Sequence, residues 1–139
     1  GRHLGLLAAA ARAALFETAW VVGAQSNRQG IRLQGAALDT RGLPQLASEP
    51  VGFGTVQLPP AGEPVVLLAE HQTTGGYPRI LEAAGAAEPV LAQAAPGCRV
   101  RFRPVELDEA DRLAHRLAVE HDHRVAGIRT TCGDAYRGE

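Results

Sequence analysis

Residues 65–78 read VVLLAEHQTTGGYP, an apolar run that passes directly into a polar loop with two adjacent glycines. The apolar part, 65–69, has the length and continuity of a buried central strand. The residues just before it, GTVQLPPAGEP at 54–64, contain a shorter β-rich segment and then a turn rich in Pro and Gly. We therefore predict two neighbouring strands in a hairpin, with the polar loop leaving the end of the second.

Outward from this hairpin, further short strands alternate with turns. Strands are predicted at 18–23, 31–34, 79–84 and 98–105, a long loop at 35–50, and helices at 4–16 and 87–94. A third helix is predicted from about Asp108 to His121, because apolar residues recur at helical spacing and Asp108 is a good N-cap. The pattern predicts a mainly β fold with two or three helices. The rival fold, an α/β sandwich, requires 79–84 to be helical.

The length and composition indicate one domain over residues 1–123, followed by a partly ordered tail at 124–139. With 14 Lys+Arg against 15 Asp+Glu the chain has no general field for nucleic acid, and its longest apolar stretch, 4–15, is too short to span a membrane. Cys98 and Cys132 lie far apart with no zinc-type spacing, which favours a reduced, cytoplasmic protein. His115, His121 and His123 are interpreted as solvated side chains, so no metal is expected.

Two loops carry the chemistry of the chain. The 71–78 loop has an imidazole, an amide and hydroxyls, and its adjacent glycines permit the positive φ angles with which backbone N–H groups converge on an anion. The 26–32 loop offers the guanidinium of Arg28 as a bidentate partner for a carboxylate, phosphate or carbamate. The alternatives are an ordinary Gly-Gly turn and a surface loop anchored by one structural Arg. Glu70, the carboxylate nearest to these residues, is interpreted as a surface charge.

Three segments together resemble one family: QSNRQGIRL at 25–33, GTVQLPPAGEP at 54–64 and LLAEHQTTGGYP at 67–78. They are similar to allophanate hydrolase subunit 2, also called the Kip-A family or the C-subunit family of 5-oxoprolinase, which is related to the carboxyltransferase domain of urea carboxylase. The QTTGGYP run is the most specific part, and the resemblance covers about residues 20–120. Gln29 and Cys98 depart from the family pattern, which often has Met and Asp there. Family members are longer, so the chain resembles their C-terminal half.

The resemblance implies a cyclophilin-like β-barrel and a Kip-I-like partner subunit. It implies a component of an ATP-dependent 5-oxoprolinase-type complex that hydrolyses a small cyclic amide, with the isolated chain inactive. One alternative is a carboxyltransferase that moves a carboxyl group from carboxybiotin to urea or a similar amide. The other is a non-catalytic module that binds a Kip-I-like kinase inhibitor. No cofactor is expected on this chain, since ATP or carboxybiotin belongs to the complex, and a homo-oligomer is left open.

We predict that the two loops form one pocket. In it Arg28 pairs with a carboxylate, Gln72 and Thr73 bind the amide, and the backbone of residues 74–76 faces developing negative charge. The predicted proton-transfer groups are His71 and Tyr77, with His71 preferred because a phenol is a poor base at neutral pH. The full set of predicted binding residues is Ser26, Asn27, Arg28, Gln72, Thr73, Thr74, Gly75 and Gly76.

Overall fold

The computed structural model describes residues 1–44 and 46–135, with side chains described as far as residue 125. The chain divides into two compact units, Gly1–Pro104 and Val105–Glu139, and each is described here by itself. The sequence predicted one domain over 1–123 and a tail over 124–139. The first unit holds all the described strands, and the second contains the long helix α3.

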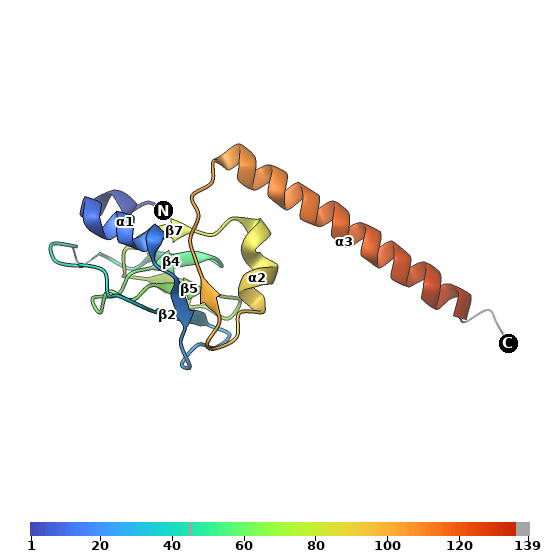
Figure 1. Ribbon diagram of the computed structural model, residues 1–139, viewed down its shortest axis with the longest axis horizontal. Coiled ribbons are helices and arrows are strands. Elements are labelled where there is room, and N and C mark those ends of the chain that lie inside the picture. The colour runs from blue at the N-terminus through green and yellow to red at the C-terminus, as the bar shows by residue number, and fades with distance from the viewer. Residues whose placement is uncertain (45, 136–139) are drawn as a thin grey trace. The chain divides into compact units, whose positions relative to one another are not determined.

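A six-stranded antiparallel sheet forms the body of the first unit, in the order β7-β4-β5-β2-β1-β8 (Figure 1). Its strands are Trp20–Val22 (β1), Gly30–Gln34 (β2), Thr55–Gln57 (β4), Val65–Leu67 (β5), Arg79–Glu82 (β7) and Arg99–Val100 (β8). A second sheet pairs Glu49–Pro50 (β3) with Thr74–Gly75 (β6). The mainly β fold is confirmed. The barrel expected from the resemblance is not closed within the described residues, because β7 and β8 remain the unpaired edges of an open sheet.

The predicted strands around the centre of this sheet are confirmed. β4 and β5 pair antiparallel as the expected hairpin, with Val56 opposite Val66. β2 shows the predicted alternation: Ile31 and Leu33 are buried, while Arg32 and Gln34 are exposed. Residues 79–82 form a strand, so the α/β sandwich is excluded.

Three predicted elements differ from the structure in their bounds. The helix predicted at 4–16 is divided into a 3-10 turn, Leu4–Leu6, and α1, Ala9–Glu17, because Leu7 is extended and buried between them. β8 ends at Val100, well short of the predicted 105. Val100 is opposite Trp20, the first residue of β1, so the ladder has no partner beyond it. The short helix α2, Glu88–Ala92, follows a 3-10 turn, Gly85–Ala87, and has Pro89 in its first turn as predicted.

The core is aliphatic around a single indole. Trp20 has an exposed fraction of 0%, and its Nε1 donates a hydrogen bond of 3.0 Å to the carbonyl oxygen of Leu15. A Cβ on Gly35 would lie 2.9 Å from the Trp20 ring, so the chain can pass the indole only with glycine there. The other buried side chains on the sheet include Val22, Ile31, Leu33, Val56, Leu58, Val66 and Ile80.

The second unit contains α3, Leu107–Ala135. The prediction that this helix ends near His121 is wrong: it continues through residues that were expected to be a tail. Low apolar content does not end a helix whose exposed residues favour helix, and Arg124 pairs with Glu120 one turn earlier at 3.4 Å. Residues 136–139 of the predicted tail lie outside the described residues. No described helix is long and apolar enough to cross a membrane.

Candidate functional site

A cavity of about 270 Å³ lies where β2, β4 and β5 meet the two polar loops. We call it the polar cavity. Its lining combines apolar side chains with amides, a guanidinium and a phenol. The lining residues are Asn27, Gln29, Gly30, Arg32, Gln57, Pro59, Val65, Leu67, Gln72 and Tyr77.

Backbone hydrogen bonds bring the two polar loops to the same side of the sheet. The amides of Leu68 and Glu70 donate to the carbonyl oxygens of Gln29 and Arg28, each over 3.0 Å. These bonds continue the pairing of β2 with β5, in which Gly30 is opposite Leu67. The loops 26–32 and 71–78 therefore both contribute to the polar cavity. The two loops lie close together because β2 pairs with β5.

The cation in the polar cavity is Arg32 rather than Arg28. The Nε of Arg28 pairs with Oε1 of Glu70 at 2.8 Å on the surface, where the Arg28 side chain is 80% exposed, and Arg28 does not line the cavity. Arg32 does line it, and its backbone amide donates over 3.0 Å to Oγ of Ser26. Ser26 therefore positions the strand that carries Arg32. Asn27 lines the cavity while its Oδ1 accepts from the amide of Gln29 at 2.9 Å.

Gln57 is the most buried polar group of the site, with an exposed fraction of 2%. Its Oε1 accepts a hydrogen bond of 3.3 Å from Nε2 of Gln72, which orients the amide. Its Nε2 is buried and has no hydrogen-bond partner within the described part of the chain. A buried donor without an acceptor is costly, so this amide is a hydrogen-bond donor available to a molecule in the polar cavity. The predicted role of Gln72 in binding stays a prediction, but the structure places Gln72 at the cavity.

The glycines of the 71–78 loop do not adopt the predicted backbone conformation. Positive φ angles among the described residues occur at Gly42, Gly54, Gly62 and Gly97, and at neither Gly75 nor Gly76. Gly75 instead pairs with Glu49 between β6 and β3. The prediction of a nest built on these glycines is therefore wrong. A glycine is needed at position 75 for steric reasons, since a Cβ there would lie 2.4 Å from Nε2 of Gln57.

The two predicted proton-transfer groups are placed differently. Nδ1 of His71 is 2.6 Å from the carbonyl oxygen of Gln72, and because a carbonyl only accepts, Nδ1 carries the proton of the neutral ring. Nε2 is then the basic nitrogen, although His71 does not line the polar cavity. Tyr77 does line it and is 48% exposed. The backbones of Thr73 and Thr74 pair with those of Val51 and Pro50, and neither Thr lines the polar cavity.

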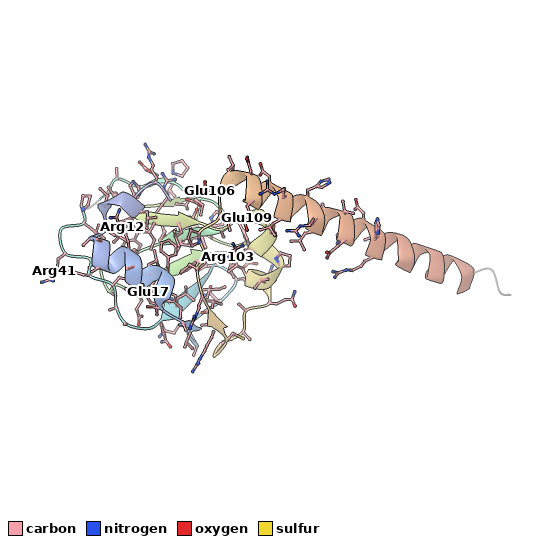
Figure 2. All side chains as sticks on the ribbon, turned by 45° about the horizontal axis from the view of Figure 1, so that its top comes forward. Arg12, Glu17, Arg41, Arg103, Glu106 and Glu109 are labelled. Carbon is pink, nitrogen blue, oxygen red and sulfur yellow. The ribbon has the colours of Figure 1, made fainter. Side chains whose placement is uncertain are left out.

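Tyr77 and Gly76 also line a second cavity of about 290 Å³, which is mostly apolar. Thr40, Leu43, Pro44 and Leu46 of the long loop also line it. Within the same loop, the carboxylate of Asp39 accepts hydrogen bonds from the side chain and the backbone amide of Arg41. Arg41 lies at the periphery of the first unit (Figure 2). These hydrogen bonds lower the pKa of Asp39 from 3.8 to about 2.

Sequence reasoning missed Arg32, Gln57 and Gln29 as lining residues. A signal was present for Arg32, a charged residue on a strand whose neighbours Ile31 and Leu33 are apolar, directly after a polar loop. No such signal marked Gln57, which stands in an apolar segment. Within the described side chains no three of His, Cys, Asp or Glu lie close enough together to hold a metal ion.

Comparisons with known proteins agree with this architecture. Residues 1–104 match the family model of the carboxyltransferase domain, subdomain A and B. The C subunits of 5-oxoprolinase from Haemophilus influenzae and Escherichia coli are 39% and 41% identical over 74% and 73% of the chain, and 33% of each relative is covered. The crystal structure of K. lactis urea amidolyase shares the fold, with a TM-score of 0.67 and 22% identity over 78% of this chain and 7% of that one.

The chain therefore belongs to the carboxyltransferase-domain family. The chain spans about one third of the length of the curated relatives it matches. The match differs from the predicted extent of 20–120 in both directions: it includes the N-terminal residues and ends at Pro104. The helix α3, which the resemblance was expected to include in part, begins beyond the matched residues.

Proposed function

We propose that the chain is the substrate-binding part of an ATP-dependent 5-oxoprolinase-type complex that hydrolyses a small cyclic amide. The observation that carries the proposal is the polar cavity, where Arg32 lines the same space as the amides of Gln57 and Gln72. A guanidinium suits a carboxylate, and side-chain amides suit the N–H and C=O of a planar amide. The similarity to the C subunits of 5-oxoprolinase supports this substrate class.

The roles follow from where each group lies. Arg32 binds the substrate carboxylate, while Gln72 and Tyr77, which line the same cavity, bind the amide. His71 directly precedes Gln72 in the same loop, outside the cavity lining, and its Nδ1 is occupied, so its Nε2 is the group able to accept a proton from water. Hydrolysis adds water across the amide: the C–N bond breaks, the carbonyl carbon becomes a carboxylate, and the nitrogen leaves as an amine that takes up a proton.

The residues of the polar cavity do not fit ATP. A triphosphate needs several cationic or backbone donors, whereas the cavity has one guanidinium and the chain has no phosphate-binding loop. The chain also contains no Lys to which biotin could be attached. We assign ATP, or carboxybiotin in the alternative reaction, to a Kip-I-like partner or another part of the complex.

The second candidate is carboxyl transfer to urea or a similar amide. It is favoured by the matched family model, which is that of a carboxyltransferase domain. The same Arg32 and amide groups suit a carbamate as well as a carboxylate. A purely regulatory module, which binds a Kip-I-like kinase inhibitor and catalyses nothing, is the third outcome of the experiment.

The experiment uses the complete complex reconstituted with its partner subunits. Turnover is measured with 5-oxoproline and ATP, and separately with urea and carboxybiotin. We expect 5-oxoproline turnover, and we expect Arg32→Gln to lower kcat/KM by about tenfold or more because a charged hydrogen bond is lost. Arg28→Gln is the matched control and stays within about twofold, since Arg28 pairs with Glu70 outside the cavity. Turnover of urea alone supports the second candidate, and partner binding without turnover of either supports the third.

A further inference from the structure

A smaller cavity of about 120 Å³ adjoins the polar cavity on β2. We call it the charged cavity. Arg32, Pro59 and Val65 line both, so the Arg32 side chain stands where the two cavities meet. The complete lining of the charged cavity is Gly23, Gln25, Arg32, Gln34, Pro59, Ala61, Glu63, Pro64 and Val65.

The charged cavity contains two side chains of opposite charge that are not paired with each other. Arg32 and Glu63 both line it, yet neither side chain is in an ion pair or hydrogen bond found among the described residues. Arg28 and Glu70, in contrast, do pair with each other, at 2.8 Å. Glu63 is half-buried, whereas Arg32 is exposed.

The backbone places Arg32 and Glu63 in diagonal positions across β2 and the turn that precedes β5. Arg32 is opposite Val65 in the pairing of β2 with β5, and Glu63 lies two residues before Val65 in the connecting turn. That turn is anchored on both sides of Glu63. Gly62 has a φ of +78° and its carbonyl oxygen accepts from Leu38 at 2.9 Å, while the oxygen of Pro64 accepts from Leu33 at 2.9 Å. Two opposite charges that line one cavity without pairing with each other suit a ligand that itself carries both charges.

An α-amino acid has this chemistry, since its carboxylate matches Arg32 and its ammonium matches Glu63. The amides of Gln25 and Gln34 line the same cavity and can take the remaining hydrogen bonds. A cyclic amide lacks the ammonium, because its nitrogen is acylated and uncharged. Ring opening releases that nitrogen as a protonated amine, so the charge that Glu63 requires exists only after hydrolysis.

We propose that the charged cavity is a product subsite that binds the ring-opened amino acid, with its ammonium on Glu63 and its carboxylate on Arg32. The inference rests on the proposed function for the identity of the amino acid. Arg32 then serves both cavities: it holds the carboxylate of the cyclic amide on one side and that of the product on the other. Glu63 is the residue that distinguishes product from substrate.

The test is calorimetric titration of the 139-residue chain with glutamate, N-acetylglutamate and 5-oxoproline. N-acetylglutamate keeps the carboxylates of glutamate but has no ammonium. We expect wild type to bind glutamate about tenfold more tightly than N-acetylglutamate, and Glu63→Gln to remove this preference while 5-oxoproline binds as before. Glu63→Asp keeps the charge and retains part of the preference. Glu70→Gln is the matched control, since Glu70 lines neither cavity.

An equal glutamate preference in wild type and Glu63→Gln overturns the inference, and so does a wild type that shows no preference for glutamate or no binding of it. A thermal melt of each variant verifies that it is folded. Inhibition of the reconstituted complex by glutamate is a second readout, and we expect Glu63→Gln to raise the inhibition constant about tenfold with little change in KM. Failure of the proposed function is distinct, because the complex then shows no turnover of 5-oxoproline whatever the chain binds.

Discussion

The sheet unit and the helix α3 obtain their structure in different ways. In residues 1–104, side chains far apart in sequence, such as Leu15, Val56 and Ile80, are completely or almost completely buried in one core. In α3 none of the described side chains, as far as residue 125, is buried. The sheet therefore depends on long-range packing, whereas the helix depends on propensity, its acidic first turn and pairs such as Glu120 with Arg124.

The same substitution in both regions is the sharpest test of this contrast, and the largest effect is expected in the sheet. Leu33→Ala removes a side chain with an exposed fraction of 0%, so we expect the free energy of unfolding to fall by about 2–5 kcal/mol. Leu117→Ala in α3, where no described side chain is buried, should cost less than about 1 kcal/mol. Urea unfolding of both variants measures the difference. Equal losses would show that α3 is packed as tightly as the sheet.

A proline in α3 tests whether the helix and the sheet unit unfold independently. Ala118→Pro removes a helical hydrogen bond and clashes with the preceding turn, which costs the helix about 3 kcal/mol or more. We expect a lower circular dichroism signal at the helical wavelength. Trp20 is the only Trp and lies in the core of the sheet unit, so its fluorescence reports that unit alone. Its unfolding midpoint should match wild type, and a shifted midpoint would mean that the two units unfold together.

The smallest of these effects concerns one glycine beside the polar cavity. Gly75→Ala places a Cβ 2.4 Å from Nε2 of the buried Gln57, so the Gln57 amide or the backbone at residue 75 must shift. We expect a loss of about 1–3 kcal/mol, as is usual for overpacking. Gly52→Ala is the control, because no atom lies within 4 Å of a Cβ there and its φ is not positive. Similar melting temperatures for the two variants would contradict the explanation of Gly75 by space.

The hairpin of β4 and β5, the strand β7 and the short helix α2 were predictable because each depends on local pattern: an apolar run, a Pro and Gly turn, a proline in a first helical turn. The end of α3 was not, since polar helix formers resemble a tail when only apolar residues are counted. The break at Leu7 could not be predicted either, because an Ala-rich segment favours helix and only the tertiary packing of Leu7 in the core interrupts it.

At the candidate site, the sequence by itself determined which two loops carry polar groups and, through the strands before and after them, that these loops leave neighbouring parts of one sheet. Only the tertiary structure decided which side chains share the cavity. The register of β2 against β5 places Arg32 in both cavities, whereas Arg28 pairs with Glu70 on the surface and lines neither. The physical reason is that a sequence specifies the order of side chains along a strand, whereas the partner strand and nearby charges determine where each side chain lies.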